Sequence, residues 1–157
     1  MSCAQSLAFS VDPYRPETLG ALADLWVESW NATLPEIDFE TRRPWFLAHV
    51  AHLRAGGTQM LVATPHAGGA PAGFVAIAPA TGYLDQLAIS PAYWGRGAAE
   101  ALMSVARTLS PTGIALDVNQ DNPRAVAFYR RLGFAVVSQG RNSLSGRAIW
   151  RMEWHPD

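Results

Sequence analysis

The residues best suited to chemistry in this chain form a glycine-rich run, Gly95-Arg96-Gly97-Ala98-Ala99, which follows an apolar segment and a proline-containing turn. Gly95 and Gly97 lack a Cβ atom, so a ligand could approach the backbone closely there. If a helix begins at this run, its first N–H groups are unpaired and carry the positive end of the helix dipole. Phosphates bind well at such helix ends. The run therefore predicts a pyrophosphate site at the carboxyl end of a strand.

A second group of candidate residues begins at Asn122-Pro123. Asn caps free N–H groups and Pro suits the first helical position, so we expect a helix to begin here. Tyr129 would share the apolar face of this helix with Phe128, and Gly133 would end it. By spacing alone, Tyr129 is typical of a core aromatic residue.

The elements that must position these residues can be predicted from hydrophobic periodicity. We expect strands at residues 7–11, 59–64, 73–78, 83–89, 114–118, 134–138 and 148–154, with Asp12-Pro13 ending the first. Helices are expected at residues 16–30, 39–54, 97–109 and 123–132. The strand-helix-strand unit over residues 84–118 should make two strands parallel, and the hairpins on either side favour antiparallel neighbours. This order predicts an α/β protein with a mixed sheet and helices on both faces.

Length and composition favour a single domain over residues 1–157 with a sizeable core, because 49% of the residues are apolar and 16% are charged. The net charge of −1, with acids and bases interspersed, lacks the cationic stripe of a sequence-independent nucleic-acid binder. Cys3 is the only cysteine, so no disulfide can form within the chain. No run of about 18 apolar residues occurs, which predicts no membrane span. These features favour a cytoplasmic protein.

Two separated motifs make the chain resemble the GNAT-type N-acetyltransferases. Residues 94–99, WGRGAA, are similar to the family pattern Q/R-x-x-G-x-G/A, although Trp94 stands where Gln or Arg is usual. Residues 122–134, NPRAVAFYRRLGF, are similar to the pattern N-x-x-A-x-x-F/L-Y-x-x-x-G-F. The resemblance covers nearly the whole chain. It implies a GNAT-like fold, a central mixed sheet of about seven strands flanked by about four helices.

The resemblance implies that the ligand of the glycine-rich run is acetyl-CoA. Its pyrophosphate would be bound by the amides of Gly95, Arg96, Gly97, Ala98, Ala99 and Glu100. The side chain of Arg96 could add charge near the phosphates or simply lie on the surface. The pantetheine arm would lie along the main chain of Leu87, Ala88 and Ile89, as an added strand does. Asn122 would contact the coenzyme while capping its helix, and the two parallel strands would splay apart to admit the acetyl group.

The resemblance also implies a reaction, in which a primary amine of a small molecule or of a peptide N-terminus attacks the thioester directly in a ternary complex. A strand N–H of Leu87 or Ile89 would stabilise the carbonyl oxygen as it gains charge. Tyr129 matches the tyrosine of the family. Because a phenol is protonated at neutral pH, Tyr129 would serve as the general acid for the departing thiolate.

The candidate general base is Asp85, acting directly or through water. Strand alternation places Asp85 on one face with Leu87 and Ile89, unless a bulge changes the facing. Asp85 could instead orient the substrate or pair with an arginine. Asp117 and Glu28 are alternatives, and deprotonation by water alone is a further one.

Residues for the acceptor amine are expected on the first two helices and at the end of the sheet. The candidates are Trp26, Glu28, Trp30 and Tyr83. Aromatic residues near a cleft would favour a partly apolar amine, although most large aromatic residues lie in a core. The identity of the amine stays open, and exposed strand edges near the C-terminus favour a homodimer.

Two alternatives compete with this interpretation. His49 and His52 lie three residues apart, without the glutamate of a zinc-protease helix, so we expect a surface pair and no metal site. A non-catalytic acyl-CoA-binding or regulatory domain of the same fold is the rival function. Tyr129 argues against this rival, because a pure binder needs no acid at the thioester.

Overall fold

The computed structural model describes residues 8–157, so Cys3 and the predicted strand residue Leu7 lie outside the described residues. The strands are β1 (Phe9–Pro13), β2 (Gln59–Pro65), β3 (Gly73–Ala78), β4 (Tyr83–Ile89), β5 (Ile114–Asn119), β6 (Ala135–Arg141) and β7 (Ala148–Trp154). The α-helices are α2 (Leu19–Thr33), α3 (Arg43–Ala55), α4 (Ala98–Leu109) and α5 (Pro123–Arg131). Short 3-10 helices are η1 (Pro16–Thr18), η2 (Phe39–Arg42) and η3 (Pro91–Tyr93). The predicted order of strands and α-helices is confirmed.

The seven strands form one sheet in the order β1-β2-β3-β4-β5-β7-β6. β4 and β5 are parallel, and every other neighbouring pair is antiparallel. The crossover through α4 explains the parallel pair, because a strand that returns in the same direction needs a connection long enough to hold a helix. The predicted mixed sheet is therefore confirmed, and it matches the GNAT-like architecture.

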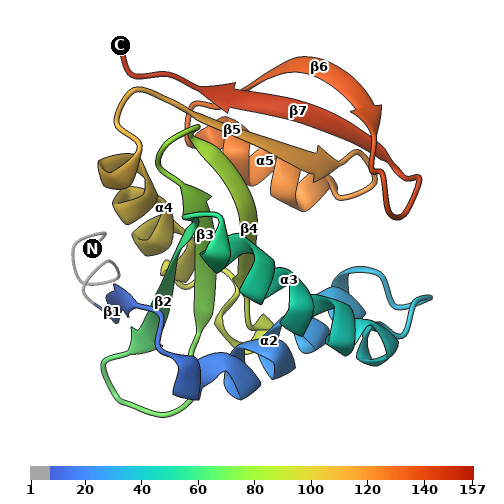
Figure 1. Ribbon diagram of the computed structural model, residues 1–157. Coiled ribbons are helices and arrows are strands. Elements are labelled where there is room, and N and C mark those ends of the chain that lie inside the picture. Colours follow the sequence, from blue (N-terminus) through green and yellow to red (C-terminus); the bar gives the residue numbers. More distant parts are fainter. Residues whose placement is uncertain (1–7) are drawn as a thin grey trace.

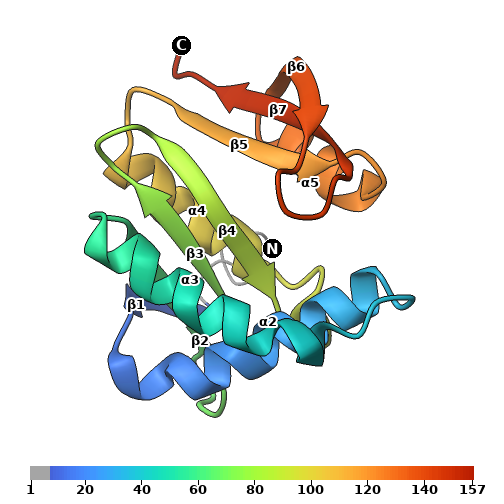
Figure 2. The ribbon, with the colours of Figure 1, turned by 45° about the vertical axis from the view of Figure 1, so that its right-hand side comes forward.

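Two apolar layers cover the two faces of the sheet. One layer buries Leu102 and Met103 of α4 and Tyr129 of α5 against the sheet. The other buries Trp26 of α2 and Phe46 of α3. Figures 1 and 2 show α2 and α3 crossing one face of β2–β4 while α4 lies on the opposite face. No helix within residues 8–157 is both long and apolar enough to span a membrane.

Element boundaries differ from the prediction where prolines stand. Asp12 and Pro13 lie inside β1 rather than ending it, because β1 is an edge strand, where a missing N–H does no harm. The helix expected from residue 39 becomes η2 followed by α3, which begins one residue before Pro44. A proline in the first turn removes only an N–H that would have no intrahelical partner in any case.

A β-bulge in β4 corrects the predicted facing of Asp85. The register pairs Ala76 with Gln86 but Ile77 with Leu84, so Asp85 is an extra residue between them. Leu84 then packs in the layer of α4, as Leu87 does, although the two are three residues apart. Asp85 instead faces α3, where it bonds to a side chain of that helix. The prediction that Asp85 shares a face with Leu87 was wrong, because a bulge shifts the alternation by one residue.

Candidate active site

The candidate site lies where β4 and β5 separate. Only one pair of residues, Tyr83 and Ala115, is in ladder register between them, and Figure 2 shows the two strands diverging beyond it. The amide of Ser90 donates to the carbonyl of Ala72, just before β3 (2.8 Å). Because backbone groups alternate in direction along a strand, those of Leu87 and Ile89 point away from β3 and toward the gap. The same alternation turns the main chain of Ala88 toward β3. The gap therefore offers unpaired backbone groups on one edge of β4.

The glycine-rich run has a backbone conformation that glycine favours. Gly95 (φ 74°) and Gly97 (φ 95°) both adopt positive φ, a region that side chains with a Cβ atom rarely enter. Gly97 is the N-cap of α4 and provides no side-chain cap, so the first amides of α4 have no capping acceptor. The amide of Arg96 is used differently, because it donates to the carbonyl of Tyr93 (3.3 Å). The run is thus an open end of a helix with donors for an anion.

A cavity of about 250 Å³ lies against this helix end, and we call it the glycine-loop cavity. Its lining includes Leu87, Ile89, Gly95, Gly97, Ala98, Ala99, Glu100, Asn122, Arg124 and Tyr129. Ala88 and Arg96, expected at the coenzyme, are not in this lining. Their proposed roles stay predictions.

Arg124 is a cation of the glycine-loop cavity that the sequence analysis did not single out. Its guanidinium carbon lies 3.5 Å from the centroid of the Trp94 ring, a cation–π contact. Partial burial lowers the pKa of Arg124 below its usual value. Trp94 in turn donates from Nε1 to the carbonyl of Ile89 (2.9 Å). The tryptophan that departs from the family pattern therefore holds both the arginine and the end of β4.

Tyr129 lies between this cavity and a second one, because it lines both. Its side chain is 7% exposed and packs edge-to-face against Phe128 and Phe134. Burial raises the pKa of Tyr129 above its usual value of 10.0. Within residues 8–157, no protein group hydrogen-bonds to its hydroxyl. The hydroxyl is therefore protonated at neutral pH and available to a ligand.

Asn122 also lines both cavities. Its Oδ1 accepts from the amide of Ala125 (3.3 Å), so the predicted helix cap is confirmed. This bond fixes the side chain at the junction of the two cavities.

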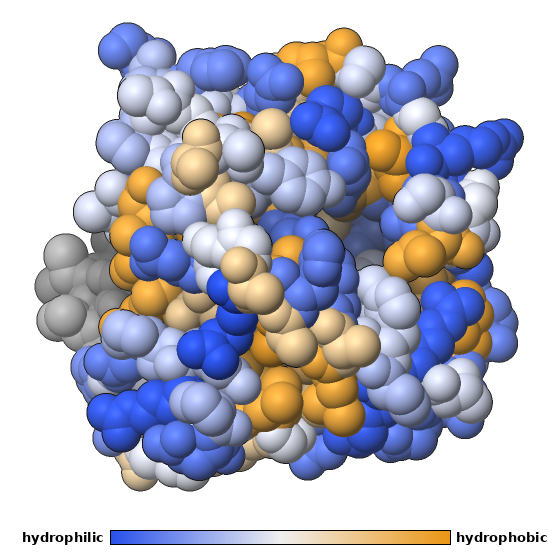
Figure 3. All heavy atoms as spheres, viewed as in Figure 1, coloured by the Kyte–Doolittle hydropathy of each residue, from blue (hydrophilic) through white to orange (hydrophobic). Residues whose placement is uncertain are grey.

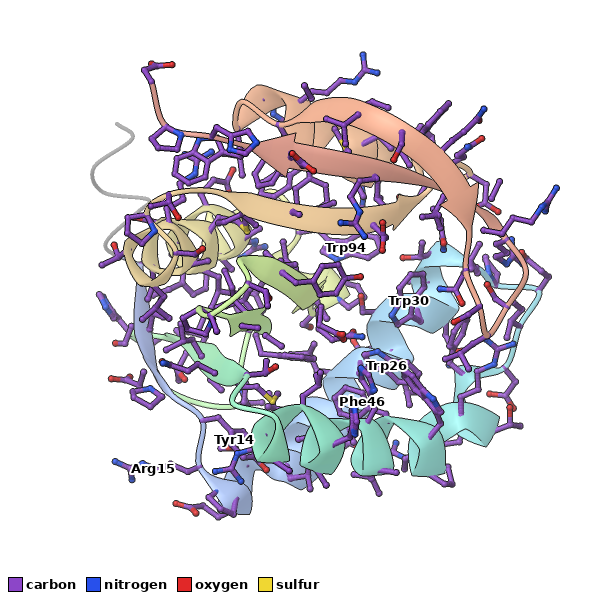
Figure 4. All side chains as sticks on the ribbon, turned by 45° about the horizontal axis from the view of Figure 1, so that its top comes forward. Tyr14, Arg15, Trp26, Trp30, Phe46 and Trp94 are labelled. Atoms are coloured by element: carbon purple, nitrogen blue, oxygen red, sulfur yellow. The ribbon has the colours of Figure 1, made fainter. Side chains whose placement is uncertain are left out.

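The second cavity, of about 730 Å³, opens between the helices α2 and α3 and the strands β4 and β5; we call it the aromatic cavity. Figure 3 shows the surface hollowed in this part of the molecule. Trp26, Trp30 and Tyr83 line it, whereas Glu28 is exposed and is not in the lining of either cavity. Figure 4 shows Trp26 and Trp30 in succession along α2, with Phe46 of α3 beside Trp26. Among residues 8–157, Nε1 of Trp26 is buried and has no hydrogen-bond partner.

The two acids of the aromatic cavity have different partners. Asp117 accepts from the hydroxyl of Tyr83 (2.9 Å) with one oxygen and from Arg151 (2.8 Å) with the other. Burial, and then the bond to Asp117, raise the pKa of Tyr83 above its usual value. Both oxygens of Asp117 are therefore engaged. Asp85 instead lies 2.7 Å from Nε2 of His49.

His49 is the functional candidate that the sequence analysis missed. It was expected on the surface with His52, but it lines the aromatic cavity, and only 20% of its side chain is exposed. The ring stacks on Trp45 at a centroid distance of 4.5 Å. The four-residue spacing of Trp45 and His49 could have indicated this stack. The contact with Asp85, 36 residues away, could not be read from spacing.

The geometry agrees with the family match. Residues 19–134 match the family model described as "Acetyltransferase (GNAT) family", which covers well over half of the chain. The chain belongs to the GNAT acetyltransferases. The predicted resemblance is confirmed, and the cavity beside the glycine-rich run lies where that resemblance expects the coenzyme.

The chain is also similar to three named proteins. It is 39% identical over 70 residues to the peptidyl-lysine N-acetyltransferase YjaB of Salmonella typhimurium, a match that spans 44% of this chain and 46% of that protein. The solution structure of apo YjaB from Escherichia coli is 25% identical, with a TM-score of 0.73 over 92% of this chain and 96% of that one. PaiA N-acetyltransferase of Thermoplasma acidophilum, solved with coenzyme A, is 19% identical, with a TM-score of 0.73 over 94% and 99%. The curated relative is thus matched over less than half of its length.

Proposed function

We propose that this protein transfers the acetyl group of acetyl-CoA to a primary amine of a small molecule or peptide, by direct attack in a ternary complex. One observation carries the proposal: the two cavities share the wall residues Trp30, Leu87, Asn122, Ala125 and Tyr129. A thioester that enters from the glycine-loop cavity and an amine that enters from the aromatic cavity would meet at this wall. Direct transfer needs that meeting, because the reacting atoms must come within about 3–3.5 Å.

The coenzyme would occupy the glycine-loop cavity. The pyrophosphate would accept hydrogen bonds from the free amides of Gly97 to Glu100, where the α4 dipole favours negative charge. Arg124, rather than Arg96, would add a positive charge, since it is the arginine of the two that lines the cavity. Coenzyme A is the ligand of PaiA N-acetyltransferase, which shares the fold.

The thioester arm would lie along β4. Three backbone groups of β4 face the gap and could bind the arm: the N–H and C=O of Leu87 and the N–H of Ile89. The carbonyl of Ile89 is left out because it already accepts from Trp94. An extended chain can bind such an edge through main-chain hydrogen bonds alone. The N–H nearest the thioester would stabilise the carbonyl oxygen in the tetrahedral intermediate.

The hydroxyl of Tyr129 would complete the reaction as the general acid. The neutral amine forms a C–N bond with the carbonyl carbon, and collapse of the tetrahedral intermediate breaks the C–S bond. The thiolate that leaves would take a proton from Tyr129, which would recover one from the nitrogen through solvent. The products are the acetamide and free CoA, and one further proton is released where the amine enters as its ammonium.

A thiol-release assay tests the proposal. Acetyl-CoA would be incubated with the protein and a panel of amines: ethylamine, amino acids, polyamines and lysine-containing peptides. We include the peptides because the curated relative is named a peptidyl-lysine N-acetyltransferase. We expect thiol release to depend on the amine and to give the acetylated product by mass. Tight acetyl-CoA binding with no release above background would instead support the non-catalytic acyl-CoA-binding domain.

A further inference from the structure

His49 and Asp85 form a pair that faces the acceptor side of the site. Nε2 of His49 lies 2.7 Å from Oδ1 of Asp85, and each side chain is only about one-fifth exposed. Both line the aromatic cavity. The pair joins α3 to the bulge in β4, so two elements fix its geometry.

The surroundings of the imidazole hold it in one orientation. Its ring stacks on Trp45, at 15° between the planes. Oδ1 of Asp85 also accepts from Gln86 (3.2 Å), which holds the carboxylate in place. When Asp85 accepts from Nε2–H, the neutral ring carries its lone pair on Nδ1. Within residues 8–157, no protein group hydrogen-bonds to Nδ1.

Most other titratable groups near His49 are bonded to partners or lie outside the cavity. On its own helix, the ring of His52 lies 6.3 Å away, and His52 does not line the cavity. Asp117 of β5 is bonded to Tyr83 of β4 and to Arg151 of β7. Arg147 is paired with Glu36 and Asp121. The remaining charged side chains of the lining are the exposed Arg42 of η2 and Arg141 of β6.

We propose that His49 is the general base that takes a proton from the acceptor ammonium, with Asp85 as the positioning residue that fixes its tautomer. This inference rests on the proposed acetyl transfer. The ammonium would give one proton to Nδ1 and become the neutral amine that attacks the thioester. The imidazolium formed would be stabilised by Asp85 and would then release its proton to solvent. Asp85 was the base candidate from the sequence, but a carboxylate is a weaker base than an imidazole.

Amines of different basicity provide the test. We would measure kcat/KM at pH 7 for the wild type and His49→Gln with ethylamine, which is protonated at that pH, and with 2,2,2-trifluoroethylamine, which is largely neutral. General-base catalysis contributes about 10²- to 10⁴-fold, so we expect a loss of about 100-fold with ethylamine. With trifluoroethylamine the loss should shrink to a few-fold, because no proton need be removed before attack. His52→Gln is the matched control, since it removes the other imidazole of α3.

The pH profile separates a base from a structural residue. In the wild type, kcat/KM for ethylamine should show a rise with pH that depends on deprotonation of the base, beyond the rise set by deprotonation of the amine itself. His49→Gln should lose this rise, and Asp85→Asn should displace it, while acetyl-CoA affinity stays unchanged in both. Equal losses with the two amines, or a wild-type pH profile in His49→Gln, would overturn the proposal. A wild type that releases no thiol with any amine would instead contradict the acetyl transfer itself.

Discussion

Replacing Tyr129 with Phe removes a single oxygen atom at the wall shared by the two cavities. The ring would keep its edge-to-face contacts with Phe128 and Phe134, at centroid distances of 5.4 and 5.5 Å. Because no protein group within residues 8–157 bonds to the hydroxyl, its removal leaves no buried partner unsatisfied. We therefore expect the free energy of unfolding to change by less than about 1 kcal/mol.

The effect on turnover should be much larger. General acids contribute about 10²- to 10⁴-fold to catalysis. Burial raises the pKa of Tyr129, so its phenol is a weaker acid than an exposed one. Part of its effect would then come from hydrogen bonding to the thiolate. This places the expected loss in kcat near the lower end, about 100-fold, which corresponds to about 2.7 kcal/mol in the activation free energy.

The assay is steady-state thiol release with saturating amine, combined with calorimetric titration of CoA. Tyr129→Phe should lower kcat about 100-fold and leave the Kd of CoA within about 2-fold, because the acid acts on the transition state and not on the bound coenzyme. Tyr14→Phe is the matched control, since Tyr14 lines neither cavity. A kcat in Tyr129→Phe equal to that of the control would refute the role of Tyr129 as acid.

Three further predictions concern the coenzyme site and stability. Gly97→Val should raise the Kd of CoA at least about 100-fold, because valine strains the positive φ and blocks the phosphate approach. Gly57→Val is the calorimetric control, because Gly57 has a similar φ (91°), lies in open space and lines neither cavity. Equal affinities in both variants would contradict the pyrophosphate site. Asn122→Ala should lower the free energy of unfolding by about 1 kcal/mol through loss of the α5 cap, as urea titration would show. Above pH 10, the free energy of unfolding should fall faster with pH in the wild type than in Tyr129→Phe. Tyr129 ionises near pH 10.0 in the unfolded chain but keeps its proton when buried, so rising pH favours the unfolded state. Parallel losses in urea titrations of the two proteins would disprove this.

Several features of the site could be predicted because they are local. The lack of Cβ atoms at Gly95 and Gly97 leaves room for a ligand at the backbone, and the cap of α5 follows from the side chain of Asn122. The element order follows from apolar periodicity, although boundaries moved beside prolines and at the ends of α2 and β6. These features depend on residues close together in the chain, so a single sequence contains the information.

The sequence by itself determined the order of strands and helices, the open helix end at Gly97 and the family to which the chain belongs. Only the tertiary structure decided that Asp85 turns to His49, that Arg124 stacks on Trp94, and that Tyr129 joins two cavities. The reason is physical. The facing of Asp85 depends on a bulge set by pairing with β3, and the other contacts join segments that meet only when α-helices pack on both faces of the sheet.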